Sequence, residues 1–150
     1  MAIIEGEYEP STWDWVREQV AEYEATGGQR ANTLRDTGLP VIVVTTRGAR
    51  SGRVRKSPVM RVEHDGEYAL VASKGGAPDN PGWYQNLVAH PGEVAVQDGP
   101  APFGVTVREV QGEERARWWE RAVAAYPPYA EYQKNTERLI PVLVATPVDA

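Results

Sequence analysis

The hydrophobic residues of this chain recur with two different periods, and each period predicts a different kind of element. Apolar side chains from Trp13 to Tyr23 have helical spacing, and Gly27-Gly28 is expected to end that helix. Ser11 is expected to cap the helix at its start. Helical patterns return over residues 83–89, over 113–125 and after Pro127-Pro128.

Two adjacent tryptophans lie in the helix expected over residues 113–125, and adjacent helical residues do not share a face. Trp119 has the spacing of the apolar face with Ala116, Ala122 and Val123, so it is expected in the core. Trp118 is then expected to be partly exposed.

Strand patterns occupy most of the remaining chain, over residues 41–46, 57–63, 67–73, 93–97, 103–110 and 142–146. The second and third runs are joined by His64-Asp65-Gly66, and Asp-Gly between two such runs indicates a hairpin. Because strands outnumber helices and hairpins dominate, we expect a mainly β, α+β fold, a small antiparallel barrel with helices outside it. We expect one domain overall, with an arm and a helix over residues 1–40 and the barrel over 41–150.

Composition restricts the function classes. The chain has 150 residues, a formal charge of -5 and no cysteine, which excludes disulfides, thiol catalysis and Cys-based metal sites. The two histidines have no metal-ligand spacing with acidic residues, so no metal site is expected. An acidic chain is not expected to bind nucleic acid in general. No apolar run approaches the roughly 20 residues of a membrane helix, and residues 1–10 lack a basic signal region. A cytoplasmic location is expected.

One segment departs from this acidic background. Six basic residues and no acid lie between Arg47 and Arg61, around the small residues Ser51 and Gly52. Such a turn exposes backbone N–H groups, and Arg50 and Arg55 can each form paired hydrogen bonds to phosphate or carboxylate. This pattern favours a site for one specific anion, although a solvated charged turn has the same composition.

Three further segments could complete a site. Ser73-Lys74-Gly75-Gly76 follows a predicted strand, where the glycines permit close approach of a ligand and Lys74 offers a charge. Trp83 could stack on a planar ligand, or could simply anchor a short helix in the core. Tyr126, Tyr129 and Tyr132 could donate hydrogen bonds or a proton to an oxygen of a substrate, or could pack the last helix on the barrel.

These segments together resemble the deazaflavin-dependent nitroreductase family. The resemblance runs from about Val41 to Pro147, and its motifs occur in the right order. They are Thr45-Thr46-x-Gly-x-Arg50-Ser51-Gly52-x-x-Arg55-x-x-Pro58, Ala72-Ser73-Lys74-x-Gly76-Ala77, Pro81-x-Trp83-Tyr84-x-Asn86-Leu87 and Tyr126-Pro127-x-Tyr129-x-x-Tyr132.

The resemblance implies a split β-barrel related to FMN-binding barrels, and coenzyme F420, an 8-hydroxy-5-deazaflavin with a phosphate and an oligoglutamate tail. It implies that Tyr126, Tyr129, Tyr132 and Ser73 act on the substrate side. It implies cofactor contacts from three groups of residues: Arg50, Ser51, Gly52, Arg55, Ser57 and Pro58; Ala72, Ser73, Lys74, Gly75 and Gly76; and Pro81, Trp83, Asn86 and Leu87.

The function expected from the resemblance is hydride transfer from reduced F420 to a small hydrophobic acceptor, an activated alkene, a quinone or a nitroaromatic. Two alternatives stay open, an FMN-binding split-barrel oxidoreductase and a non-catalytic carrier of the deazaflavin. A monomer or a homodimer is expected, without a transmembrane segment, and the arm could touch a membrane surface.

Overall fold

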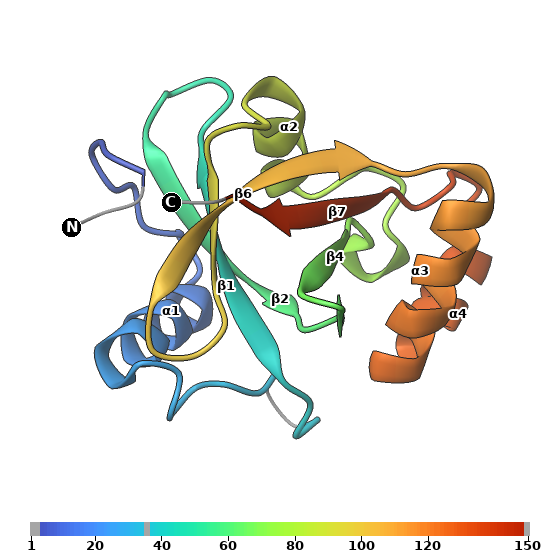
Figure 1. Cartoon of the computed structure of the whole chain (residues 1–150), viewed down its shortest axis with the longest axis horizontal. Helices are drawn as coiled ribbons and strands as arrows, with labels where there is room; N and C mark the ends of the chain where they lie inside the picture. The colour runs from blue at the N-terminus through green and yellow to red at the C-terminus, as the bar shows by residue number, and fades with distance from the viewer. Residues whose placement is uncertain (1–3, 35–36, 149–150) are drawn as a thin grey trace.

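The computed structural model describes residues 4–34 and 37–148, which form a curled antiparallel sheet flanked by helices (Figure 1). Within these residues the sheet has seven strands in the order β2-β1-β5-β6-β7-β4-β3 and is a half-barrel. The strands are β1 (Val41–Arg47), β2 (Val54–Met60), β3 (Glu63–His64), β4 (Glu67–Val71), β5 (Val94–Gln97), β6 (Pro102–Glu109) and β7 (Val142–Pro147). The helices are α1 (Asp14–Thr26), α2 (Gly82–Ala89), α3 (Gly112–Ala125) and α4 (Pro128–Lys134), and a 3-10 turn, η1, spans Lys74–Gly76. The expected mainly β split barrel with flanking helices is confirmed.

The predicted hairpin exists, but its first strand is shorter than the pattern suggests. Asp65 and Gly66 both have positive φ, +52° and +83°, as a two-residue type I′ turn requires, and they join β3 to β4. The preceding run of apolar residues is divided, because β2 ends at Met60 and pairs along its whole length with β1, from Val41↔Met60 to Arg47↔Val54. The sequence pattern alone does not show where this change of partner occurs.

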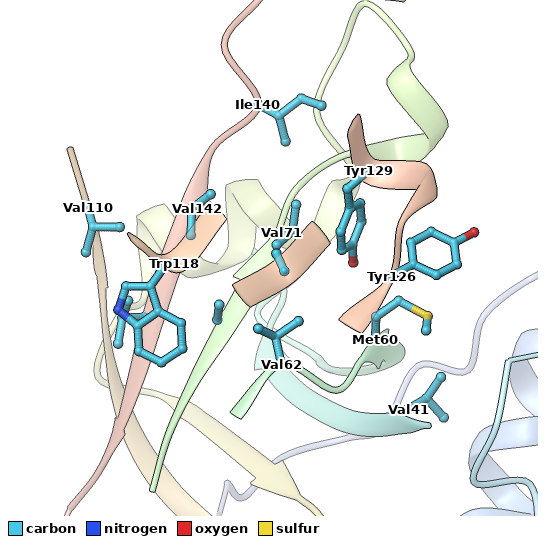
Figure 2. Packing of buried hydrophobic residues seen from close by; sticks show 13 residues of the cluster. Val41, Met60, Val62, Val71, Val110, Trp118, Tyr126, Tyr129, Ile140 and Val142 are labelled. Carbon is cyan, nitrogen blue, oxygen red and sulfur yellow. The ribbon is translucent and has the colours of Figure 1, made fainter. Parts of the chain in front are cut away.

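The two faces of the sheet bury different sets of side chains. On β7, Leu143 and Ala145 belong to one cluster with Leu87 of α2, whereas Val142 and Val144 belong to a second cluster beneath α3 and α4. Figure 2 shows this second cluster. The alternation follows from the two-residue period of a strand. Helix α1 covers a separate part of the sheet, where Val20 and Tyr23 pack on Val43.

Helix α1 confirms one expectation and corrects another. Gly27 and Gly28 have positive φ, +62° and +80°, and end the helix as predicted, with Gly28 N–H donating to Tyr23 O. Ser11 does not cap it: the helix begins at Asp14, and the Ser11 hydroxyl accepts the N–H of Trp13.

The prediction for the two tryptophans of α3 is wrong. Trp118 is buried with 3% of its surface exposed and packs with Ala122 in the cluster below the helix, while Trp119 lies at the margin of that cluster. Arg115 lies over the Trp119 ring at 5.0 Å and donates to Ile140 O, so a cation occupies the side where the spacing placed the core.

No helix in the described part of the chain has both the length and the apolar character that a membrane crossing requires.

Candidate functional site

A cavity of about 180 Å³ opens between the end of β2, the η1 turn, α2 and α4. Apolar strand residues, the Met60 thioether and several aromatic rings line it, and Ser73 and Lys74 bring polar groups to it. Its lining consists of Leu34, Val41, Pro58, Val59, Met60, Val71, Ser73, Lys74, Pro81, Trp83, Tyr126, Tyr129 and Tyr132. Figure 2 shows Met60, Tyr126 and Tyr129 together on one side of the cluster below α3 and α4.

The three tyrosines converge because the chain turns between α3 and α4. Tyr126 ends α3, Pro127 and Pro128 interrupt the helix, and α4 then carries Tyr129 and Tyr132. The Tyr126 and Tyr129 rings meet edge to face with centroids 4.9 Å apart. The hydroxyls of Tyr126 and Tyr132 are 3.0 Å apart, and either can be the donor. The predicted grouping of these side chains is thus present as a cluster with two linked phenols.

The phenols of Tyr126 and Tyr129 are held in the neutral form by their surroundings. Burial, together with the hydrogen bond to Tyr132, raises the pKa of Tyr126 to about 12. Burial also raises the pKa of Tyr129, whose ring is 3% exposed. A neutral phenol keeps its proton near pH 7, so Tyr126 can donate a hydrogen bond there.

The η1 turn brings Ser73 and Lys74 against α4. Lys74 and Gly76 have positive φ, +46° and +83°, and a Cβ at Gly76 would lie 2.8 Å from the backbone oxygen of Tyr132. Only glycine permits this approach. The Lys74 ammonium is 2.9 Å from the Asp79 carboxylate, and this ion pair lowers the pKa of Asp79.

Arg138, which the sequence did not single out, holds this turn from behind. Its guanidinium donates to three backbone oxygens and to one side chain: Ala77 O at 2.8 Å, Ser73 O at 2.8 Å, Ala72 O at 3.2 Å and Asn80 Oδ1 at 2.7 Å. These partners precede Arg138 by about sixty residues, so no local motif in the sequence could have indicated it.

The basic segment over residues 47–61, from the end of β1 to just beyond β2, is largely neutralised by its surroundings. Across the described residues, Arg50 alone among the six cations has neither an ion pair nor a hydrogen bond, and it is exposed. The five ion pairs are Arg47–Glu93, Arg53–Glu7, Arg55–Glu9, Lys56–Glu24 and Arg61–Asp98. Three of the acids come from residues 7–24. Folding therefore pairs the cations of this segment with acids that are distant in the sequence.

A continuous strip of β2 connects this basic segment to the cavity. Arg55, Ser57 and Val59 lie on one face of the strand because they are two residues apart, and Val59 lines the cavity. At about 3.3 Å per residue, the strip from Arg55 to Val59 is about 13 Å long. Asn86 of α2 fixes the near end of the loop, since its side chain accepts the N–H of Ala49 and donates to Thr46 Oγ1.

The structure therefore brings together part of the predicted site around the cavity and leaves the rest beside it. Pro58, Ser73, Lys74, Pro81, Trp83, Tyr126, Tyr129 and Tyr132 line the cavity. Outside its lining are Arg50, Ser51, Gly52, Arg55, Ser57, Ala72, Gly76, Asn86 and Leu87, and the surroundings of Gly75 lie outside what the structure describes. Leu87 is buried in the core, 1% exposed, while Ser51 and Gly52 are exposed in the loop.

Comparison with known proteins gives a consistent family. The sequence model of the family described as F420H(2)-dependent quinone reductase matches residues 15–147. The F420H(2)-dependent quinone reductase Rv1261c of Mycobacterium tuberculosis is 36% identical over 129 residues, which cover 84% of this chain and 85% of that protein.

Solved structures agree with this result. A structure described as an F420-H2 dependent reductase, FDR-A, is 56% identical, with a TM-score of 0.67 over 71% of this chain and 93% of that one. A structure described as a domain-swapped dimer is 51% identical, with a TM-score of 0.69 over 90% of this chain and 99% of that one. HutZ, a heme storage protein from Vibrio cholerae, shares the fold at 10% identity, with a TM-score of 0.54 over 90% of this chain and 92% of that one.

Proposed function

This chain belongs to the F420H(2)-dependent quinone reductase family, and on that premise we propose that its tyrosine-lined cavity holds the deazaflavin ring beside the electron acceptor. F420 is the cofactor, and the protein is an F420H2-dependent reductase of quinone-like acceptors. The observation that carries the placement is the cavity itself, where Trp83 and the tyrosines face the Ser73-Lys74 turn. Hydride transfer from C5 is the chemistry that the reduced ring supplies when bound.

The residues present fit both ends of this cofactor. Aromatic and apolar side chains suit a flat ring, and Gly76 lets the Ser73-Lys74 turn lie against the backbone of Tyr132, so that both line the same cavity. The strip of β2 leads from the cavity to Arg55, and Arg50 lies in the loop before it as an unpaired, exposed cation among the residues that the structure describes. We assign the phosphate and the tail to this loop, with Ser51, Gly52 and Ser57 along the way.

The remaining cofactor contacts follow from the same placement. The Ala72–Gly76 segment would run beside the chain between ring and phosphate, with Lys74 as its charge. Pro81 and Trp83 would bound the ring. Asn86 and Leu87 would act from α2, where Asn86 ties down the loop and Leu87 anchors the helix.

The tyrosines would orient and protonate the acceptor. A quinone, enone or nitro group gains electron density on oxygen as it is reduced, and a neutral phenol can hydrogen-bond that oxygen. The raised pKa keeps Tyr126 protonated, so it can donate this hydrogen bond, and its hydroxyl is 3.0 Å from that of Tyr132. Tyr132 is partly exposed, so water can return the proton that the pair gives up. Ser73 supplies a further hydroxyl at the cavity, and Tyr129 supports the other two rings.

Binding and turnover test the proposal separately. F420 titrated into the apoprotein should bind, as followed by cofactor fluorescence, and Arg50→Ala/Arg55→Ala should weaken binding at least about tenfold. Arg30→Ala/Arg117→Ala removes two exposed arginines elsewhere and serves as the control. Reduced F420 is then tested with menadione, a cyclic enone and a nitroimidazole. Binding that both double variants retain equally would refute the assigned tail site, and no turnover of any acceptor would refute the assignment of the cavity.

The proposal also covers the identity of the electron acceptor and the oligomeric state. We favour a quinone as acceptor, since the family is described by quinone reduction. A relative at 51% identity is described as a domain-swapped dimer, which supports a homodimer over a monomer for this chain.

A further inference from the structure

The arm before α1 is fixed along the outer edge of β2 by its backbone. Val54 N–H donates to Glu7 O at 2.8 Å, and Glu9 N–H donates to Val54 O at 2.9 Å, which makes a parallel bridge between Tyr8 and Val54. Ile4 is buried against Val54 and Ala95. The position of the arm therefore does not depend on the carboxylates of its glutamates.

Two of those carboxylates pair with two arginines at the start of β2. Glu7 lies 3.5 Å from the Arg53 guanidinium, and Glu9 lies 3.2 Å from that of Arg55. In extended chain, residues two apart share a face at a spacing of about 7 Å, so two acids on the arm meet two arginines with the same spacing. The arm thus presents to the loop a short chain that bears carboxylates at regular intervals.

The tail of F420 has the same chemistry, because it too is a chain of glutamates. We propose that Glu7 and Glu9 compete with the cofactor tail for Arg53 and Arg55, and so set how strongly the protein prefers a long tail. This inference rests on the proposed function, which places the phosphate and the tail at this loop. Glu7 and Glu9 then act as specificity-determining residues for the cofactor.

The exposure of these pairs makes the exchange feasible. The Glu7 side chain is 75% exposed and the Arg53 side chain 51% exposed, and ion pairs in water are weak. A tail that carries several charges and is already held at its ring and phosphate gains from a high effective concentration. It can displace the glutamate side chains while the arm stays on β2.

The test compares two ligands and two double variants. F420 with a tail of several glutamates is titrated against 8-hydroxy-5-deazariboflavin, which has neither phosphate nor tail, by cofactor fluorescence. Glu7→Gln/Glu9→Gln should bind the tailed cofactor about two- to tenfold more tightly than the wild type, because one exposed and one partly exposed ion pair no longer compete. The tailless ligand should bind both proteins alike. High salt should reduce the difference, since it screens exposed charges.

A control separates competition from net charge. Asp14→Asn/Glu22→Gln removes two exposed acids that pair with Arg17 and Arg30, and it changes the charge of the chain equally. Equal affinity of Glu7→Gln/Glu9→Gln and wild type for the tailed cofactor overturns the inference. So does an equal gain in the control or with the tailless ligand. If the tailed cofactor does not need Arg50 and Arg55, the proposed tail site fails and the inference fails with it.

Discussion

Arg138 shows how one side chain can position a segment that is far away in the sequence. Its guanidinium holds the carbonyls of Ala72, Ser73 and Ala77, which span the turn assigned to the cofactor. Carbonyl groups at a turn do not find partners in a neighbouring strand, so a planar cation with five N–H donors is well suited to bind several of them. The geometry of Ser73 and Lys74 in the cavity therefore depends on a residue that does not line it.

Replacing Arg138 should accordingly affect stability and binding together. Arg138→Met should lower the free energy of unfolding by about 2–4 kcal/mol, because it removes the donor to the carbonyls of Ala72 and Ala77 and one of the two donors to that of Ser73. It should also weaken F420 binding. Arg138→Lys should restore part of both, since a lysine keeps the charge but reaches fewer of the oxygens. Urea denaturation and fluorescence titration measure the two effects, with the exposed Arg117→Met as control. A loss in Arg138→Met no larger than in the control would contradict the positioning role.

At single positions, the sequence was a good guide to which side chains gather locally and a poor guide to which side chains pair over long distances. The spacing of Tyr126, Tyr129 and Tyr132 was sufficient to group them, because they lie close together in the chain around two prolines and their rings meet locally. The acids that neutralise the basic loop lie elsewhere, such as Glu24 with Lys56, so charge counted along the sequence overstated the local field. The burial of Trp118 depends on which side of α3 meets the sheet, and the helix pattern predicted the wrong side.

At the scale of elements, the contact between η1 and α4 connects the cofactor segment to the tyrosines. Gly76 has a positive φ and lies against the backbone of Tyr132. The turn and the helix therefore touch at a point where residue 76 has no room for a side chain. A displacement of either element would move Lys74 and Tyr132 relative to each other. The contact between the turn and α4 thus fixes the positions of both Lys74 and Tyr132 in the cavity lining.

Gly76→Ala should separate these two elements. A left-handed conformation strains alanine, and its Cβ would meet Tyr132 O at 2.8 Å, so the free energy of unfolding should fall by about 2–5 kcal/mol. Cofactor binding should weaken as well. Gly82→Ala is the matched control, because Gly82 is helical and has no atom within 4 Å of the added Cβ, so this variant should be neutral or slightly more stable. Equal stability of the two variants in thermal denaturation would contradict this account.

The elements themselves were mostly predictable. The β-branched runs and the Asp-Gly turn indicated the strands, and the double glycine and double proline indicated where α1 and α3 end. The division of the chain between β2 and β3 was not predictable, because it depends on β2 choosing β1 as its partner. Pairing between distant strands is a tertiary property, and local propensity does not specify it.

For the whole molecule, several buried or hydrogen-bonded tyrosines make stability depend on alkaline pH. The hydrogen bond to Glu109, together with burial, raises the pKa of Tyr84 to about 12, and the pKa of Tyr126 is also about 12. Burial raises the pKa of Tyr68, which also donates to Asp98. The folded state therefore retains protons that the unfolded chain releases near pH 10.

Below about pH 10 both states keep these protons, so the contribution of these groups to the free energy of unfolding should not change with pH. As the pH rises from there to about 12, the free energy of unfolding should fall. Urea denaturation at intervals from pH 8 to pH 11 measures the slope. Tyr84→Phe removes one such proton and should make the slope shallower above pH 10. A slope that is the same in Tyr84→Phe and wild type would show that the Tyr84 phenol does not contribute.

Pro58 affects whether the edge of the sheet can pair with a strand from another molecule. In the sheet order, β2 and β3 are the two outer strands, and such strands can recruit a strand from another chain. The polar backbone groups of Val54 face outward and are taken by the arm, and by the two-residue period those of Pro58 face outward too. Proline has no N–H to offer there, and β3 is only two residues long. Both open margins of the sheet are thus poor templates for a further strand, which protects the folded protein against aggregation through its edges.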